Sequence, residues 1–182
     1  MSRREQIEMN DAEVVAFLAE ERTVTCATAG PRGWPHLMPL WYVLRDAAPV
    51  GQEPGGGPDS PDPSASPGPR VWVWTYARSQ KVKNLERDSR ATLQVEAAET
   101  YAELRGAMFE CEAIVHRDLG IVARLGAEIL LRNSVPRGES PPPELSPEAV
   151  AAVEAQAPKR VGLEFVEIRR ATWDHRKLGG GY

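Results

Sequence analysis

The 182-residue chain is long enough to bury a hydrophobic core and has the size of a single domain. Its 22 Lys and Arg residues against 26 Asp and Glu residues give a net charge of -4, which excludes the basic excess typical of proteins that bind nucleic acids or anionic membranes. No segment approaches the ~18 apolar residues that cross a bilayer, and the N-terminus has no apolar signal segment. We therefore expect a cytoplasmic protein without nucleic-acid or membrane partners.

The cysteines and histidines predict neither a metal site nor a disulfide framework. The three histidines are far apart in the sequence and no Cys-x-x-Cys pair occurs, so no residues have the spacing of metal ligands. Cys26 and Cys111 each lie inside an apolar run. We expect both to be buried, reduced thiols of the core.

The N-terminal quarter of the chain predicts a helix followed by a β-hairpin. Asn10 and Glu13 form a capping-box pattern, and apolar residues then recur at helical spacing. Residues 23–29 are rich in β-forming residue types and end at the Gly-Pro-Arg-Gly turn signal of residues 30–33. Residues 35–45 follow as a second strand, so the two strands are expected to pair.

Residues that break regular structure are concentrated in two segments. Seven of the 16 prolines and five of the 15 glycines lie in residues 47–70, and another five prolines lie in residues 133–148. The first segment predicts a disordered insertion, because it contains too little apolar surface to order itself, and the second predicts a Pro-rich loop at 133–147. Residues 71–76 form a strong strand pattern, so the insertion is interpreted as an enlarged connection between two antiparallel strands.

The remainder of the chain predicts strands with short helices between them. The expected elements are a helix that begins at Ser79, strands at 91–96 and 104–117, a helix capped by Asp118, a helix at 146–156 and a last strand at 160–168. The six strands follow one another in hairpin order. This order favours a small antiparallel barrel in one domain of residues 1–182 over a parallel α/β sheet.

The most informative stretch is residues 71–84, where an aromatic strand leads into a helix. The first turn of that helix, residues 79–81, carries Ser, Gln and Lys beside free backbone N–H groups and the positive end of the helix dipole. These groups favour an anion-binding site, to which Arg78 and Lys83 add positive charge. The alternative is that Arg78, Lys81 and Lys83 form only a solvated helix face.

Five aromatic residues fall on the two strands that flank the insertion. Trp72, Trp74 and Tyr76 alternate along one strand and therefore share a face, and Trp41 and Tyr42 lie on the other strand. Either this face packs as core, or it binds a flat conjugated ligand beside the anion-binding turn.

Four motifs in chain order resemble the pyridoxamine 5′-phosphate oxidase-like split-barrel superfamily. They are P-H-x-x-P-x-W at 35–41, W-T-Y-A-R-S-Q-K-V-K-N-L-E-R-D at 74–88, E-L-R-G at 103–106 and W-D-H-R-K-L-G-G at 173–180. Within this superfamily the chain is most similar to the branch of flavin and deazaflavin oxidoreductases. The resemblance implies a mainly β fold, a six-stranded antiparallel split barrel with short helices, and a homodimer with two cofactor sites at the subunit interface.

The resemblance also implies which residues bind the cofactor. The residues implied for its phosphate-bearing tail are Trp74, Thr75, Ser79, Gln80 and Lys81, with Asn84 nearby. The residues implied for its ring system are Met38, Pro39, Leu40 and Trp41. Three C-terminal residues, Trp173, His175 and Arg176, would approach the cofactor of the other subunit. No catalytic base is expected, because the cofactor ring performs the hydride chemistry.

The identity of the cofactor stays open between FMN and the deazaflavin coenzyme F420. Pyridoxamine-phosphate oxidases place basic residues for the FMN phosphate at the positions of Met38 and Val43, and this chain has neither. We therefore expect no oxidation of pyridoxamine phosphate. The longer phosphodiester and oligoglutamate tail of F420 would give Arg78, Lys81 and Lys83 more negative charge to meet.

The function expected from these residues is hydride transfer between bound F420 or FMN and a small conjugated organic substrate. One alternative is a protein that sequesters a flavin, a deazaflavin or haem without turnover. Another is a barrel with no cofactor, in which the aromatic residues are core. Among the histidines, His116 at a strand end is expected to be structural.

Overall fold

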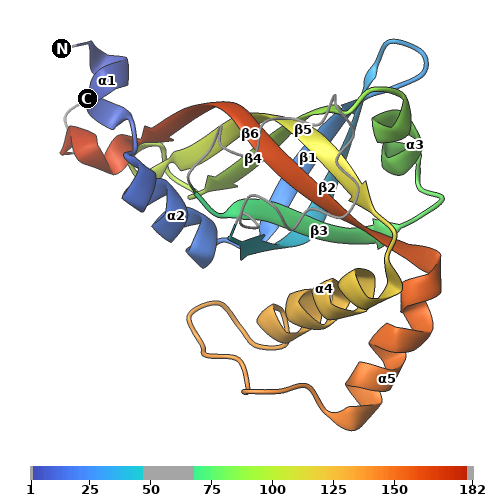
Figure 1. The fold of residues 1–182 in the computed structure, drawn as a ribbon. Helices are drawn as coiled ribbons and strands as arrows, with labels where there is room; N and C mark the ends of the chain where they lie inside the picture. Colours follow the sequence, from blue (N-terminus) through green and yellow to red (C-terminus); the bar gives the residue numbers. More distant parts are fainter. Residues whose placement is uncertain (1, 47–67, 180–182) are drawn as a thin grey trace.

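The computed structural model describes residues 2–46 and 68–179. Six antiparallel strands close into a barrel in the order β1-β2-β3-β6-β5-β4, and β4 pairs with β1 (Figure 1). The strands are β1 (Thr23–Ala29), β2 (Pro35–Arg45), β3 (Arg70–Tyr76), β4 (Arg90–Ala97), β5 (Arg105–His116) and β6 (Arg160–Asp174). The helices are α1 (Arg3–Ile7), α2 (Asp11–Glu20), α3 (Gln80–Arg87), α4 (Leu119–Arg132) and α5 (Pro147–Gln156), and 3₁₀ turns lie at Tyr101–Glu103, Ala157–Lys159 and His175–Leu178.

The predicted six-stranded antiparallel barrel of the mainly β class is confirmed. The hairpin of β1 and β2 has the predicted bounds, and its strands pair from Ala29 opposite Pro35 to Thr23 opposite Trp41. The Asn10 cap of α2 is confirmed as a capping box, in which the Asn10 side chain accepts a hydrogen bond from the Glu13 amide.

The end of β6 and the presence of helix α1 differ most from the sequence prediction. β6 continues through Asp174 instead of ending at residue 168, because β5 supplies a hydrogen-bonded neighbour from Gly162 to Asp174, with a register shift between Glu110 and Cys111. The shift interrupts the inside–outside alternation on which the sequence prediction relied. Helix α1 was not predicted, because it has a capping box at Ser2 but no buried residue and therefore no apolar periodicity.

The core fills the inside of the barrel and extends under α2. Val14, Phe17 and Leu18 of α2 are buried against the inward-facing residues of the strands. Cys26 and Cys111 are buried among them, as predicted. Burial raises the pKa of the Cys26 thiol to about 12 and raises that of Cys111 further, so both thiols are protonated and unreactive at neutral pH.

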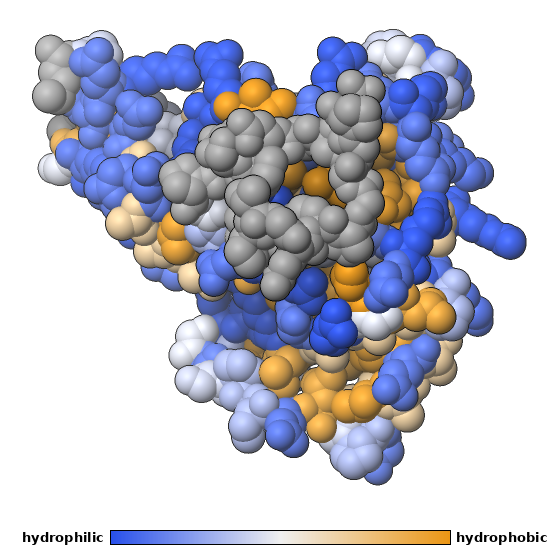
Figure 2. Space-filling model, in the orientation of Figure 1, coloured by the Kyte–Doolittle hydropathy of each residue, from blue (hydrophilic) through white to orange (hydrophobic). Residues whose placement is uncertain are grey.

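Helices α4 and α5 form a separate layer on the outside of the barrel (Figure 1). Leu125 and Ile129 of α4 pack on Val43 and Trp72 in a second apolar cluster. Figure 2 shows apolar residues gathered over α4 and along the side of α5 that faces it. This layer covers the outer face of β2 and β3, where the aromatic residues of the sequence motifs lie.

Of the two segments rich in proline, the structure describes the second in full and only the end of the first. The predicted insertion at 47–70 falls mainly on residues 47–67, which lie outside the described residues, and Arg70 already belongs to β3. Residues 133–146 connect α4 to α5 without a helix or strand, and Pro147 is the first residue of α5. Among the described residues, no helix has the length and apolar character needed to cross a membrane.

Candidate functional site

Strands β2 and β3 separate next to the predicted site. Residues 42–45 of β2 pair with residues 70–73 of β3, whereas residues 35–41 of β2 pair with β1 alone. Residues 74–76 of β3 pair only with β6. The two strands are therefore neighbours, as predicted, but Trp41 and Trp74 lie just beyond the point where β2 and β3 stop pairing.

A cavity of about 480 Å³ lies at this separation, and we call it the α4 cavity. On the barrel side it is lined by Thr23, Pro39, Leu40, Trp41, Trp74 and Arg160. On the helix side it is lined by Gly126, Ile129, Leu130 and Val153. The cavity brings together four of the predicted cofactor residues, Pro39, Leu40, Trp41 and Trp74. Its volume is in the range typical of small-molecule sites.

Gly126 explains how α4 approaches the barrel at this cavity. A Cβ atom at this position would lie 2.9 Å from Cε2 and Cζ2 of Trp74 and 2.9 Å from Cγ1 of Val153. The absence of a side chain therefore lets the helix backbone rest on the Trp74 ring. The sequence alone does not reveal the role of this glycine, because that role depends on Trp74, which lies on strand β3.

Lys81 is a buried cation at the start of α3. Only 6% of its surface is exposed, and its Nζ donates a hydrogen bond to Oγ1 of Thr75 at 3.1 Å. None of the ion pairs formed within residues 2–46 and 68–179 includes Lys81. Burial lowers the pKa of Lys81, and the positive charge of Arg160 lowers it further. Arg78 and Lys83 are exposed, so a solvated helix face describes these two residues but not Lys81.

The neighbouring Ser79 also has unused hydrogen-bonding capacity. Ser79 is the N-cap of α3, but its side chain makes no capping hydrogen bond, and its buried Oγ has no partner among the described residues. An N-cap serine usually accepts a hydrogen bond from an amide of the first turn. The first-turn amides of α3 therefore lack the partner that would normally satisfy one of them.

Gln80 and Asn84 serve to fix α3 on the barrel. The Gln80 side-chain amide donates to Oδ1 of Asn84 at 2.8 Å, and the fully buried Asn84 donates to Oγ1 of Thr28 on β1 at 2.9 Å. Val82 and Leu85 are buried beneath the helix, as the sequence predicts. The helix start that carries Ser79 and Lys81 is therefore held in a defined position.

Arg160 lies on the aromatic face and was missed by sequence reasoning. It is the first residue of β6 and pairs with Tyr76 of β3. Its Cζ lies 3.6 Å from the ring centre of Tyr76 and 4.4 Å from that of Trp74. Its Nε and the Nε1 of Trp74 are buried without a hydrogen-bond partner in the described part of the chain. Only the register between β3 and β6 places this arginine here, and no local sequence signal reveals it.

The strand alternation predicted for β3 divides the site into two sides. Trp74 and Tyr76 face outward with Arg160, whereas Thr75 faces inward and holds Lys81. Met38 of β2 lies opposite Cys26, is 39% exposed and is not among the residues that line the α4 cavity. Trp74 and Thr75, both predicted to bind the cofactor tail, therefore lie on opposite faces of β3.

The outward face of β3 continues into a buried ionic cluster under α4. Trp72 stacks on His116 with 4.5 Å between ring centroids, and Nε2 of His116 lies 2.8 Å from Oε2 of Glu164. Glu164 also forms an ion pair with Arg70. Burial alone would raise the pKa of Glu164, but the hydrogen bonds from His116 and Arg70 outweigh it and lower this pKa. His116 therefore has the structural role that the sequence predicts.

The three C-terminal candidate residues lie at the other end of β6. Trp173 lies opposite Gly106, where a Cβ would come within 2.3 Å of the indole ring. His175 Nδ1 lies 3.0 Å from a backbone carbonyl oxygen, and Arg176 forms an ion pair with Asp174. At a rise of ~3.3 Å per residue, a strand as long as β6 separates them from Arg160 by roughly 40 Å. The structure thus groups these residues together, but not with Trp74 or Lys81 of the same chain.

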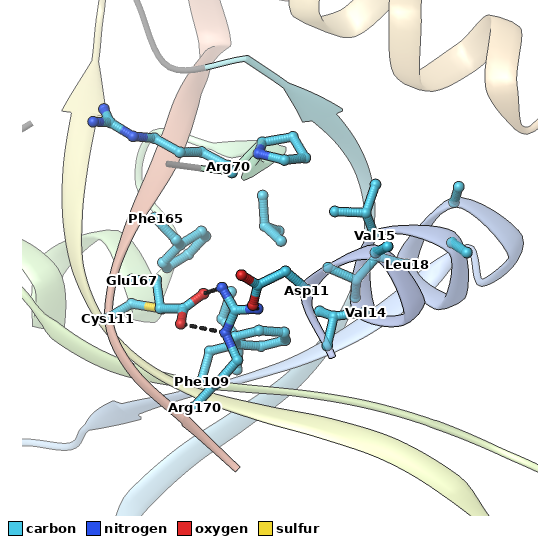
Figure 3. A pocket seen from close by; sticks show the side chains of 17 residues that line it. Asp11, Val14, Val15, Leu18, Arg70, Phe109, Cys111, Phe165, Glu167 and Arg170 are labelled. Carbon is cyan, nitrogen blue, oxygen red and sulfur yellow. Dashed lines mark hydrogen bonds and ion pairs between the residues drawn. The ribbon is translucent and has the colours of Figure 1, made fainter. Parts of the chain in front are cut away.

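A second cavity, of about 500 Å³, lies at the end of the barrel beside α2 (Figure 3). Its walls are mainly apolar, and two arginines line it. Arg170 is paired with Glu167 at 2.5 Å and with Asp11 at 3.1 Å, and the more deeply buried Arg70 is paired with Glu164. None of the predicted site residues lines it. Both arginines have carboxylate partners, whereas Lys81 of α3 and Arg160 of the α4 cavity have none among the described residues.

Comparisons with known proteins agree with this fold. The family model described as pyridoxamine 5′-phosphate oxidase matches residues 11–157. Among solved structures, the conserved hypothetical protein Rv2991 from Mycobacterium tuberculosis is 33% identical with a TM-score of 0.74, and the match covers 100% of this chain and 95% of that one. A comparison with curated proteins found no match.

More distant structures share the fold alone. HutZ, the haem storage protein from Vibrio cholerae, is 13% identical with a TM-score of 0.57 over 90% of this chain and 93% of its own. An F420 reductase is 13% identical with a TM-score of 0.52 over 85% of this chain and 93% of its own. At such identities a common barrel does not carry function from one protein to another.

The family match runs from the first residue of α2 through the end of α5, and so includes α3 and every residue that lines the α4 cavity except Arg160. The resemblance drawn from the four sequence motifs is therefore confirmed by an independent comparison. This chain belongs to the pyridoxamine 5′-phosphate oxidase family.

Proposed function

We propose that this protein is an oxidoreductase that binds F420 or FMN and transfers hydride to or from a small conjugated organic compound. The observation that carries the proposal is the buried Lys81 ammonium, which has a hydroxyl partner but no carboxylate among the described residues. A buried charge without a counter-ion is costly, so such a group is retained where a ligand completes it. The partnerless Ser79 hydroxyl and the helix N-terminus beside it fit the same anionic ligand.

The residues present would hold such a cofactor in two parts. Ser79, Lys81, Thr75 and the first-turn amides of α3, which together we call the anion site, would bind the phosphate. Gln80 and Asn84 would hold the helix start in place. Met38, Pro39, Leu40 and Trp41 of β2 would line the ring system. The cofactor supplies the hydride donor or acceptor, and the chain binds it, orients it and keeps water away.

The charges around the anion site support F420 over FMN. Arg78 and Lys83 are exposed on either side of Lys81, where they would meet negative charge beyond the first phosphate. The tail of F420 carries such charge and FMN does not.

Exposed apolar residues on the hairpin of β1 and β2 support a homodimer. Trp34 is 76% exposed, Leu37 56% and Trp41 54%, which is unusual for large apolar side chains gathered on one hairpin. A second copy of the chain would cover them. In such a dimer Trp173, His175 and Arg176 of one protomer would approach the cofactor of the other.

The test of the anion site compares Lys81→Met with Lys83→Met. Both substitutions remove one positive charge from α3, but only Lys81 is buried beside Ser79. Hydrogen bonds to charged groups contribute about 1.5 to 3 kcal/mol, so Lys81→Met should raise the Kd for F420 or FMN about tenfold or more. Lys83→Met should change it about twofold or less. Equal Kd values for wild type and Lys81→Met, by fluorescence titration, would refute the anion site.

Turnover separates an oxidoreductase from a protein that only sequesters its cofactor. Reduced cofactor bound to the protein is mixed with quinones, enones and other conjugated compounds, and its absorbance is followed. Oxidation that is faster than that of free cofactor supports the enzyme. Retention of reduced cofactor against the whole panel would instead support sequestration.

A further inference from the structure

We propose that the α4 cavity binds the organic substrate through a carboxylate group that pairs with Arg160. The substrates of this protein are then flat, conjugated carboxylates. That this ligand is the substrate rests on the proposed function, but the assignment of a carboxylate ligand to Arg160 rests on the cavity itself.

Arg160 has the features of an anion receptor. Its guanidinium is stacked on the rings of Trp74 and Tyr76, and its Nε is buried without a hydrogen-bond partner in the described residues. It takes part in none of the ion pairs found there, and Glu164, four residues further along β6, already pairs with Arg70 and His116. A stacked guanidinium has a fixed orientation, and its planar donors match a carboxylate in bidentate geometry.

The remaining walls of the α4 cavity define the body of the ligand. Trp41 and Trp74 supply flat aromatic surfaces, and Ile129, Leu130 and Val153 supply apolar ones. Besides the Arg160 guanidinium, the polar side-chain groups of the lining residues are the Thr23 hydroxyl and the indole N–H groups of Trp41 and Trp74. A flat apolar ligand with a single anionic end satisfies all of these surfaces at once.

Arg160 and the anion site serve two different anions. Thr75 faces inward and holds Lys81, whereas Trp74 and Tyr76 face outward and carry Arg160, so β3 separates the two cations. They nevertheless repel each other, since the charge of Arg160 contributes to the lowered pKa of Lys81. Two neighbouring cations without carboxylate partners among the described residues are stabilised most when each receives an anion. A neutral ligand in the α4 cavity would leave Arg160 unpaired.

The experiment measures two probes of nearly the same shape, 2-naphthoate and the neutral 2-naphthamide, by isothermal titration calorimetry. It uses the whole chain, with and without F420 or FMN. We expect wild type to bind naphthoate about tenfold or more tightly than the amide, because only the acid forms charge-assisted hydrogen bonds with Arg160. Arg160→Gln should abolish that preference and Arg160→Lys should retain part of it. Arg124→Gln, an exposed change on α4, is the matched control and should leave the preference intact.

Three outcomes would overturn the inference: wild type that binds acid and amide equally, wild type that binds neither probe, or Arg160→Gln with an unchanged preference. Because the first two comparisons need no variant, the test stands even where Arg160→Gln does not fold. Lys81→Met separates this inference from the proposed function, since it should lose F420 or FMN but keep the preference for naphthoate. A wild type that binds naphthoate through Arg160 but neither cofactor would refute the oxidoreductase and leave the carboxylate site.

Discussion

The ammonium of Lys81 couples the stability of the protein to its ligand. Burial lowers the pKa of Lys81 from its ordinary value of 10.5. Between the lowered and the ordinary pKa the unfolded chain binds more protons than the native protein, so the Lys81 contribution makes stability rise with pH across that window. Below the window the full cost of the buried charge remains, and a bound anion would offset it.

Lys81→Met should therefore increase the stability of the cofactor-free protein at neutral pH, because it removes a buried charge and keeps the apolar stem. The advantage over wild type should shrink as the pH rises towards 10.5, because native Lys81 loses its proton at a lower pH than Lys81 of the unfolded chain. Urea unfolding of both proteins at a series of pH values measures it, with the exposed Lys83→Met as control. A difference between wild type and Lys81→Met that does not change with pH would exclude Lys81 as its source.

Residue by residue, the sequence predicts the part of the site that is local. Ser79, Gln80 and Lys81 follow one another at a helix start, so their anion-binding chemistry can be predicted without knowledge of the fold. Arg160 and Gly126 carry no such signal, because each acquires its role by contact with Trp74, which is far away along the chain. Burial of Lys81 but not of Lys83 was likewise decided by how α3 rests on the barrel.

At the scale of elements, boundaries set by local sequence are predicted correctly, whereas boundaries set by pairing with a distant strand are not. The hairpin of β1 and β2 is fixed by its own turn and alternation, and its predicted bounds agree with the structure. The end of β6 is fixed instead by pairing with β5, across a register shift at Glu110. The pairing of β5 with β6 cannot be inferred from the residues of either strand alone.

The contact between α4 and β3 can be tested at Gly126. Gly126→Ala gains about 1 kcal/mol of helix propensity, but its Cβ would lie 2.9 Å from the Trp74 ring, and overpacking of this kind costs typically 1 to 3 kcal/mol. The clash should win, because Trp74 is held between α4 and Arg160. We expect a lower midpoint of unfolding in urea and altered tryptophan fluorescence.

Gly120→Ala is the control on the same helix. Gly120 is exposed, and its Cβ would lie 3.2 Å from the Asp118 side chain, with no aromatic ring near it. This variant should be at least as stable as wild type. If Gly126→Ala were also as stable as wild type, α4 would not rest on Trp74 as closely as the structure shows.

Across the whole molecule, the candidate residues fall at the two ends of β6. The anion site and the α4 cavity adjoin its start at Arg160, and Trp173, His175 and Arg176 adjoin its end beside α1 (Figure 1). One chain does not bring them together. A homodimer with cofactor sites between the protomers would unite them, and the exposed apolar hairpin of β1 and β2 is available for that contact.

Cofactor binding by the intact protein is the central claim, and native mass spectrometry tests it most directly. The purified protein is titrated with F420 and, separately, with FMN, and the masses of the intact assemblies are recorded. We predict a dimer that carries two molecules of one of these cofactors, with Lys81→Met losing them under the same conditions. The mass of the bare chain or bare dimer at every concentration of both cofactors would contradict the proposed function.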